Sequence, residues 1–182
     1  MFLAAAVVAL VLVVLGGAAA AVLLVRSPSA SPGSGRRARG AFPVLCQETM
    51  ALSNESYEGS AAIVAMRGCR ITLTRVTLRG TNPVVATGGA EVTIVGGSID
   101  GLGTSAIQAV DGARVTVSGD AFLEGENTVS AIQGATVTLT SATVRGTRVA
   151  LSAMVGGTID AASARNVTVV GEISQLGGRV IR

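Results

Sequence analysis

Histidine, lysine and tryptophan are missing from this chain of 182 residues, and aromatic residues make up only 2% of it. Without histidine, the chain lacks the side chain that most often acts as a general base or metal ligand near neutral pH. Without lysine, it can form no Schiff base with a substrate and no phosphate-binding loop of the lysine-containing type. We therefore expect neither a cofactor nor a bound metal.

All basic residues are arginines, and the formal net charge is +3. They are spread along the chain except for one short cluster at Arg36, Arg37 and Arg39. Nucleic-acid-binding domains usually concentrate basic residues on one face and add aromatic side chains that stack on bases. The sequence has neither feature, so we expect no nucleic-acid partner.

The first feature that is present is an uncharged apolar run over residues 2–25. As a helix rising about 1.5 Å per residue it would be about 36 Å long, enough to cross a hydrocarbon core of about 30 Å. We interpret residues 1–26 as a single-pass transmembrane anchor. A cleavable signal peptide is the alternative, because residues 18–20 are alanines, but no basic residue precedes the run and it continues beyond these alanines.

Residues 27–40 are rich in serine, proline, glycine and arginine, which predicts a flexible linker. The arginines near the apolar run all follow it, and the positive-inside rule then favours a cytoplasmic location for the rest of the chain.

From about residue 60 the chain repeats with a period of 22 residues. Three columns of aliphatic residues define the repeat: Ile63, Val85, Ile107, Val129, Leu151 and Ile173; Ile71, Val92, Val115, Val137, Ile159 and Ile181; and Leu78, Ile99, Leu123, Val144 and Val169. Apolar residues alternate with polar ones inside each segment, which is typical of a strand with one buried face. Each repeat thus predicts three short strands, each pairing in parallel with its equivalent in the next repeat.

The stretches GAEVTIVGGSIDG, GARVTVSGDAFLEG and GATVTLTSATVRG resemble the right-handed parallel β-helix repeats of the pectate-lyase-like superfamily. The resemblance covers residues 60–182 and implies an all-β fold, a short right-handed parallel β-helix solenoid that follows the anchor. With a period of 22 residues we expect about five coils. We expect residues 41–59 to cap the first coil, and the C-terminal end of the solenoid to be open.

Cys46 and Cys69 are separated by about one coil. If Cys46 lay over Cys69, their Cα atoms would be about 5 Å apart, within the range of a disulfide. A disulfide would favour an exported domain, whereas in the cytoplasm the two thiols would stay reduced and pack as small buried side chains. Because the charge flanks favour the cytoplasm, the side of the membrane stays open.

Members of the resembled superfamily that cleave acidic polysaccharides use carboxylates on one face, often with calcium and an arginine base. The nearest counterpart here is an outward file of Arg79, Asp100, Glu124 and Arg145. Its two carboxylates would lie about 5 Å apart, close enough to share acid and nucleophile roles. The simpler interpretation is two cross-strand ion pairs, Arg79 with Asp100 and Glu124 with Arg145, which stabilise the sheet.

Two more outward files are candidates for binding. A threonine file, Thr72, Thr93, Thr116 and Thr138, resembles the flat arrays of ice-binding β-helices, although Val95 and Asp160 interrupt it. A small, uncharged file, Ala86, Gln108, Ser130 and Ser152, would suit a lateral contact face.

Our main hypothesis is a membrane-anchored structural, scaffolding or protein-interaction module without evident catalytic activity. Its open C-terminal end would add another copy or a different protein by continuing the strand ladders. The alternatives are a β-helix that binds or cleaves polysaccharide through Asp100 and Glu124 and, less directly, ice binding through the threonine file.

Overall fold

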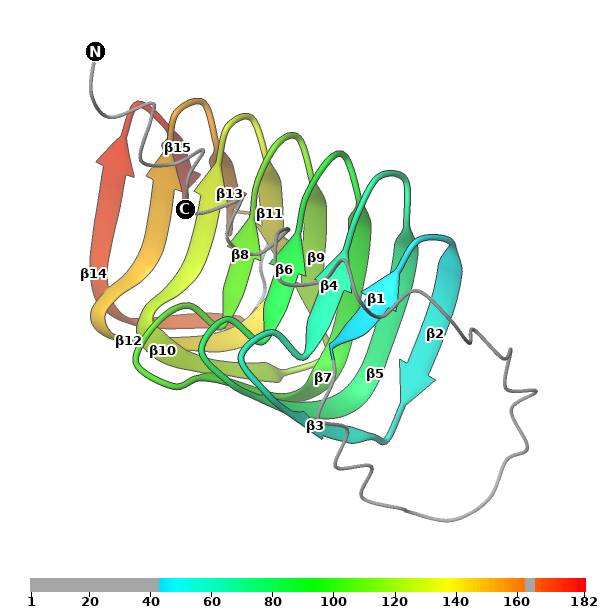
Figure 1. The fold of residues 1–182 in the computed structure, drawn as a ribbon. Coiled ribbons are helices and arrows are strands. Elements are labelled where there is room, and N and C mark those ends of the chain that lie inside the picture. Colours follow the sequence, from blue (N-terminus) through cyan, green and yellow to red (C-terminus); the bar gives the residue numbers. More distant parts are fainter. Residues whose placement is uncertain (1–42, 163–165) are drawn as a thin grey trace. The chain divides into compact units, whose positions relative to one another are not determined.

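The computed structural model describes residues 43–162 and 166–182, which form a parallel β-solenoid of about six turns (Figure 1). The predicted all-β parallel solenoid is confirmed, with about one turn more than expected. Among these residues no helix is both long and apolar enough to cross a membrane. The expected anchor at residues 1–26 and linker at 27–40 lie outside the described residues.

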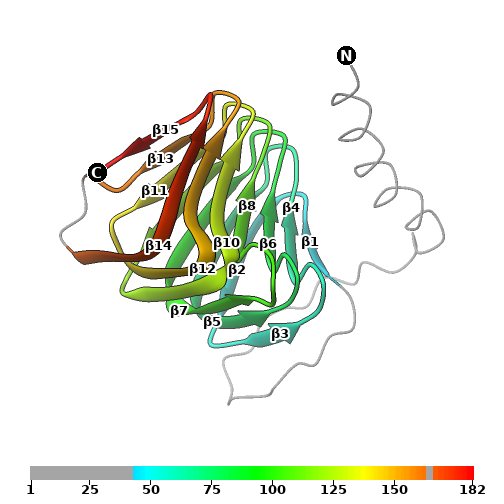
Figure 2. The ribbon, with the colours of Figure 1, turned by 90° about the vertical axis from the view of Figure 1, so that its left-hand side faces the viewer.

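A turn contains three strand positions, and the end-on view in Figure 2 shows the three resulting faces. Face 1 consists of β1 (Val44–Cys46), β4 (Ile63–Ala65), β6 (Val84–Ala86), β8 (Ile107–Ala109) and the C-terminal parts of β10 (Ala121–Ile132), β12 (Ser141–Met154) and β14 (Asn166–Leu176). Face 2 consists of β2 (Thr49–Ser53), the N-terminal parts of β5 (Arg70–Arg79) and β7 (Glu91–Gly101), β9 (Arg114–Ser118), β11 (Thr136–Leu139), β13 (Thr158–Asp160) and β15 (Arg179–Ile181). Face 3 consists of β3 (Ser56–Glu58) and the remaining parts of β5, β7, β10, β12 and β14.

Aliphatic side chains fill the interior as continuous stacks. Ile107, Val129 and Leu151 are Cα partners on successive turns of face 1, and all three are fully buried. Burying one such side chain stabilises the fold by about 1.5–3 kcal/mol, so the stacks supply the main driving force for winding the chain. The alternation in β5 sends Ile71 and Leu73 inward and Thr72 outward, as predicted.

One predicted core position on face 1 is wrong. Ile63 pairs with Val84, which in turn pairs with Ile107, so Val84 is buried in the core and Val85 points outward. The two turns contain 21 and 23 residues (63 to 84 and 84 to 107). Their mean is 22, so a constant step reaches the right residue at Ile107 but misses the intermediate one.

Residues 41–59 were expected to be a cap, but the described part of this segment forms the first turn of the solenoid. Its strand β1 pairs with β4, and β2 and β3 both pair with β5. The 22-residue step hides this turn because Val44 pairs with Ile63, only 19 residues later. A similar shortening at the other end makes Val180, rather than Ile181, the partner of Ile159.

Glycines stack at the corner between face 3 and face 1, where Gly101, Gly125 and Gly146 are Cα partners. A Cβ atom on Gly146 would lie 2.4 Å from the backbone nitrogen of Ala150, and one on Gly101 would lie 2.4 Å from that of Ala106. Neither of these two glycines has a positive φ. Close approach of the backbone, rather than a special backbone angle, therefore requires glycine at this corner.

Candidate functional site

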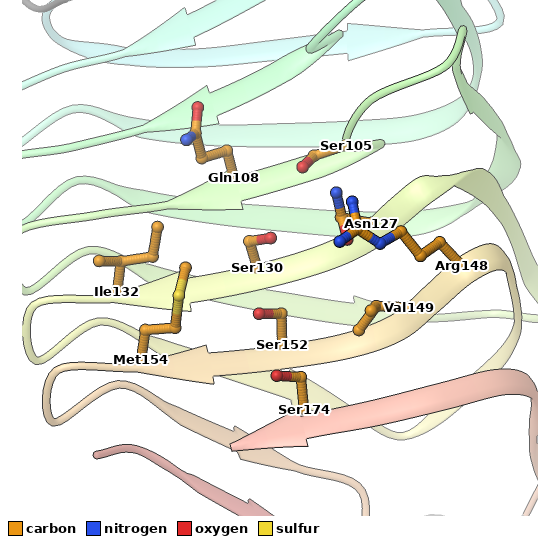
Figure 3. A pocket seen from close by; sticks show the side chains of 10 residues that line it. All are labelled: Ser105, Gln108, Asn127, Ser130, Ile132, Arg148, Val149, Ser152, Met154 and Ser174. Carbon is orange, nitrogen blue, oxygen red and sulfur yellow. The ribbon is translucent and has the colours of Figure 1, made fainter. Parts of the chain in front are cut away.

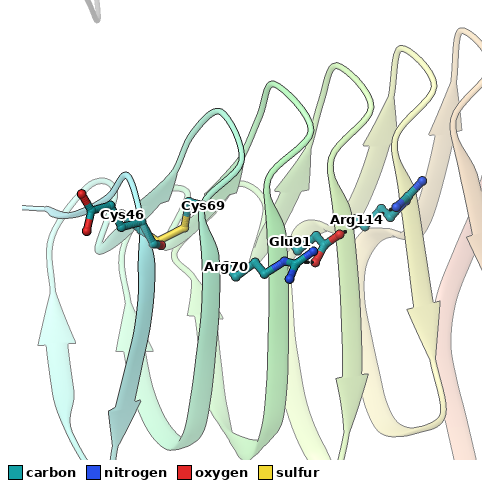
Figure 4. A network of polar contacts seen from close by, with 6 residues as sticks. Cys46, Cys69, Arg70, Glu91 and Arg114 are labelled. Atoms are coloured by element: carbon teal, nitrogen blue, oxygen red, sulfur yellow. Dashed lines mark hydrogen bonds and ion pairs between the residues drawn. A yellow bond between two sulfur atoms is a disulfide. The ribbon is translucent and has the colours of Figure 1, made fainter.

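A disulfide joins Cys46 at the end of β1 to Cys69, which directly precedes β5, and both residues are fully buried (Figure 4). Their Cα atoms are 5.7 Å apart. Cys46 does not lie over Cys69, as the sequence interpretation assumed, because its Cα partner is Ala65. The disulfide instead connects the first turn to the corner between faces 1 and 2 of the next turn.

An ion-pair cluster on face 2 was not found in the sequence analysis (Figure 4). The Glu91 carboxylate lies 2.8 Å from Nε of Arg70 and 3.7 Å from an Nη atom of Arg114. The steps between these partners are 21 and 23 residues (70 to 91 and 91 to 114), so a constant period of 22 does not align them. Pairs this exposed contribute at most about 1 kcal/mol each.

The four charged residues predicted to stack on face 3 do so. Arg79, Asp100, Glu124 and Arg145 are Cα partners on successive turns. Nε of Arg79 lies 3.2 Å from the Asp100 carboxylate, which agrees with the ion pair expected there.

The second expected pair differs in the structure. Cζ of Arg145 lies 6.0 Å from the ring centroid of Phe122, and Arg145 makes no ion pair with Glu124 among the described residues. Phe122 pairs with Thr143, so its ring lies diagonally across from Arg145, where the face of an aromatic ring attracts a guanidinium. Asp100 and Glu124 therefore occupy adjoining turns, one of them beside an arginine and the other without one.

A groove of about 350 Å³ runs over face 1, at a distance from these carboxylates (Figure 3). Its floor is the file of Gln108, Ser130, Ser152 and Ser174, which are Cα partners on β8, β10, β12 and β14. Asn127 and Arg148 lie along one side of this file, and Ile132 and Met154 along the other (Figure 3).

The serine floor of the groove is nearly covered by its walls. Ser130 and Ser152 are only 5% and 7% exposed, and their hydroxyl groups form no hydrogen bond with another described residue. Ala86, which was expected in this file, is instead fully buried and pairs with Ala109. Its place belongs to Val85, because the short turn before β6 shifts this strand by one residue relative to the constant period.

The predicted threonine file also forms, since Thr72, Thr93, Thr116 and Thr138 are Cα partners on face 2. The file ends at Asp160, which pairs with Thr138. In the neighbouring file, the hydroxyls of Ser118 and Thr140 donate to backbone carbonyls, at 3.2 and 3.1 Å. These two hydroxyls are therefore already used within the solenoid, and the outward array is narrower than the sequence suggests.

The last described turn exposes part of its apolar surface. In the described ranges, β14 pairs with β12 alone and β15 with β13 alone. Val170 is 47% exposed and Leu176 is 69% exposed. At the opposite end the Tyr57 hydroxyl donates to the Glu55 carboxylate, and burial together with this contact raises the pKa of Tyr57.

Metal-binding chemistry has no obvious place in the described ranges, which contain no group of three or more cysteine, aspartate or glutamate residues arranged to hold an ion. No protein-family model, no curated protein and no solved structure matches this chain. The function must therefore be argued from the residues and the geometry of the solenoid itself.

Proposed function

We propose that this protein is a membrane-anchored structural or protein-interaction module, and that its solenoid binds a protein partner by continuing the strand ladders at the C-terminal end. The observation that carries the proposal is the one-sided pairing of β14 and β15 in the described residues, next to the exposed side chains of Val170 and Leu176. A strand edge with free backbone donors and acceptors is a template for another strand.

The partner strand would gain from two sources. Each backbone hydrogen bond that it forms is worth a net 0.5–1.5 kcal/mol, a range of about threefold. Covering the apolar side chains at the edge adds about 25 cal/mol for each Å² of apolar surface removed from water. The half-buried interior residues Val169, Ile173 and Val180 would then become fully buried, as their equivalents in the middle of the solenoid already are.

We also propose a relationship with the pectate-lyase-like β-helices, supported by the parallel pairing, the three strands per turn and the aliphatic stacks. The polysaccharide chemistry of that superfamily finds less support. Asp100 is held in an ion pair with Arg79, and the groove lies over face 1 rather than beside Asp100 and Glu124. We therefore assign the face 3 file a stabilising role in the sheet.

The buried Cys46–Cys69 disulfide supports placing the solenoid on an oxidising side of the membrane. This side is opposite to the one favoured by the arginines that follow residues 2–25. Long exported domains can override that charge preference, so the proposal gives the disulfide more weight. Protease treatment of intact cells should digest the solenoid if this placement is right and spare it if the solenoid is cytoplasmic.

Chemical cross-linking of the full chain in its native membranes tests the proposed docking edge. Val170→Lys puts a charge on the edge strand at an already exposed site, and should abolish cross-linked species that the wild type forms. Val95→Lys is the matched control, because Val95 is also exposed, at 36%, but lies on β7 in the middle of the solenoid. The proposal fails if the wild type forms no cross-linked species or if both variants lose them equally.

A further inference from the structure

The two end turns of the solenoid differ in charge. The first turn, residues 43–59, contains Glu48, Glu55 and Glu58 and no basic residue. The last described stretch, residues 166–182, contains Arg179 and Arg182 against the single acidic residue Glu172. The side chains therefore give formal charges of −3 at the first turn (three acids) and +1 at the last (two bases, one acid).

From this asymmetry we infer that the partner at the C-terminal edge is a second copy of the same chain, docked head-to-tail with its first turn on the last turn of its neighbour. The inference rests on the proposed function, because it names the occupant of the edge proposed there. Its own support is the charge difference and the way in which the strand files of the two ends line up.

Two of the three faces continue across such a junction. On face 1, β1 of the second copy would lie on the C-terminal part of β14, and on face 2, β2 would lie on β15. The files match in chemistry, because the interior residues Val44 and Met50 would follow Ile173 and Val180. On the outside of face 2, Ala51 would follow Ile181.

Face 3 differs, because its six described strand positions are one fewer than the seven on each of the other faces. The turn begins on face 1 with β1 and ends on face 2 with β15, so one strand position on face 3 stays empty at the junction. The contact therefore depends on faces 1 and 2. The carboxylate of Glu48, in the corner between these faces, lies at the level where Arg179 begins the last strand of the neighbour.

The charges also decide the polarity of the contact. Two first turns placed together would bring six carboxylates into one junction, and two last turns would bring together four arginines with two glutamates. Head-to-tail docking instead places the acidic turn against the basic one, and like charges at short range are the usual means of rejecting a wrong orientation. A head-to-tail contact does not close on itself unless the rotation brings the ends together, so repeated docking would give a filament.

Cysteine cross-linking of the purified full chain tests the orientation. One tagged batch carries Ala51→Cys and a differently tagged batch carries Ile181→Cys; both sites lie on the outside of face 2. In the head-to-tail contact the two residues occupy adjoining strands about 4.8 Å apart, within reach of a disulfide. We expect a heterodimer that carries both tags, and no dimer within either batch alone.

Thr116→Cys is the matched control, since Thr116 belongs to the same outward file but lies in the middle of the solenoid. Mixed with Ile181→Cys, it should give no heterodimer. Dimers within the Ala51→Cys batch would mean a head-to-head contact and overturn the inference. Absence of every dimer would overturn it as well, but would leave the docking edge standing if the Val170→Lys experiment in membranes succeeds.

The charges are tested separately by exchange. A variant with Glu48→Arg, Glu55→Arg and Glu58→Arg has two basic ends and should lose self-association. Adding Arg179→Glu and Arg182→Glu to the same chain exchanges the charges of both ends and should restore it. If the triple variant still associates like the wild type, or if the exchanged variant folds but does not recover association, charge does not select the contact. Circular dichroism of each variant establishes that the solenoid is intact.

Discussion

Breaking the Cys46–Cys69 disulfide should loosen the first turn of the solenoid while leaving its middle intact. The two cysteines are 23 residues apart in sequence. For a loop of this length the chain-entropy model gives about 11 cal/mol/K, which is about 3 kcal/mol near room temperature. Because each turn of a repeat structure contacts only its neighbours, the loss should be concentrated where the disulfide lies.

Urea unfolding of the full chain in detergent, followed by circular dichroism with and without reductant, measures this loss. Hydrogen exchange locates it: amides of β1 and β2 should lose protection on reduction, and those of β9 and β11 should keep it. The double variant Cys46→Ala, Cys69→Ala separates the covalent bond from other effects of the reductant. It should already be destabilised and should not respond to reductant further.

Two results would refute this reasoning. One is a change in unfolding free energy well below 1 kcal/mol when the wild type is reduced, although the model requires about three times as much. The other is loss of protection in β9 and β11 as early as in β1, which would mean that the solenoid unfolds as one cooperative unit rather than turn by turn.

Three further predictions concern single side chains. Gly146→Ala should lower the unfolding free energy by about 1–3 kcal/mol or more, because the new Cβ would lie 2.4 Å from a backbone nitrogen, whereas Gly59→Ala meets nothing within 4 Å and should change it by less than about 1 kcal/mol; equal effects in urea unfolding would contradict the steric argument. Thr128→Val should cost about 1 kcal/mol in the same assay, because the buried hydroxyl donates to a backbone carbonyl at 2.7 Å, and no cost would show that this bond is unimportant. Asp100→Asn with Glu124→Gln should lower stability by at most about 1 kcal/mol, and a polysaccharide-cleaving activity of the wild type that this variant loses would contradict the structural role of the file.

The fold was predictable because its signal is repeated in every turn. Alternation of aliphatic and polar residues, as in Val92-Thr-Ile94, marks each strand locally, and recurrence of the pattern marks the winding. The face 3 file was found for the same reason: Arg79 and Asp100 each follow an aliphatic residue of the third column, so their position did not depend on a constant period.

What escaped prediction depends on the length of individual turns. The 21- and 23-residue turns moved Val84 into the core and Val85 out of it, and they also concealed the contact of Glu91 with Arg70 and Arg114. Because side chains alternate between the two faces of a strand, an error of one residue reverses inside and outside. The same error placed the buried Ala86 in an outward file.

The sequence by itself determined that the chain winds into parallel turns around an aliphatic interior, because burial of the recurring Ile, Val and Leu residues requires this whatever the loops do. The tertiary structure alone decided which residues become neighbours across turns: that Cys46 lies over Ala65 yet bonds to Cys69, that Arg145 turns to Phe122 rather than Glu124, and that serines form the floor of a groove. The physical reason is that alternation along a strand is a local property, whereas register between turns is set by the loops and corners that connect them.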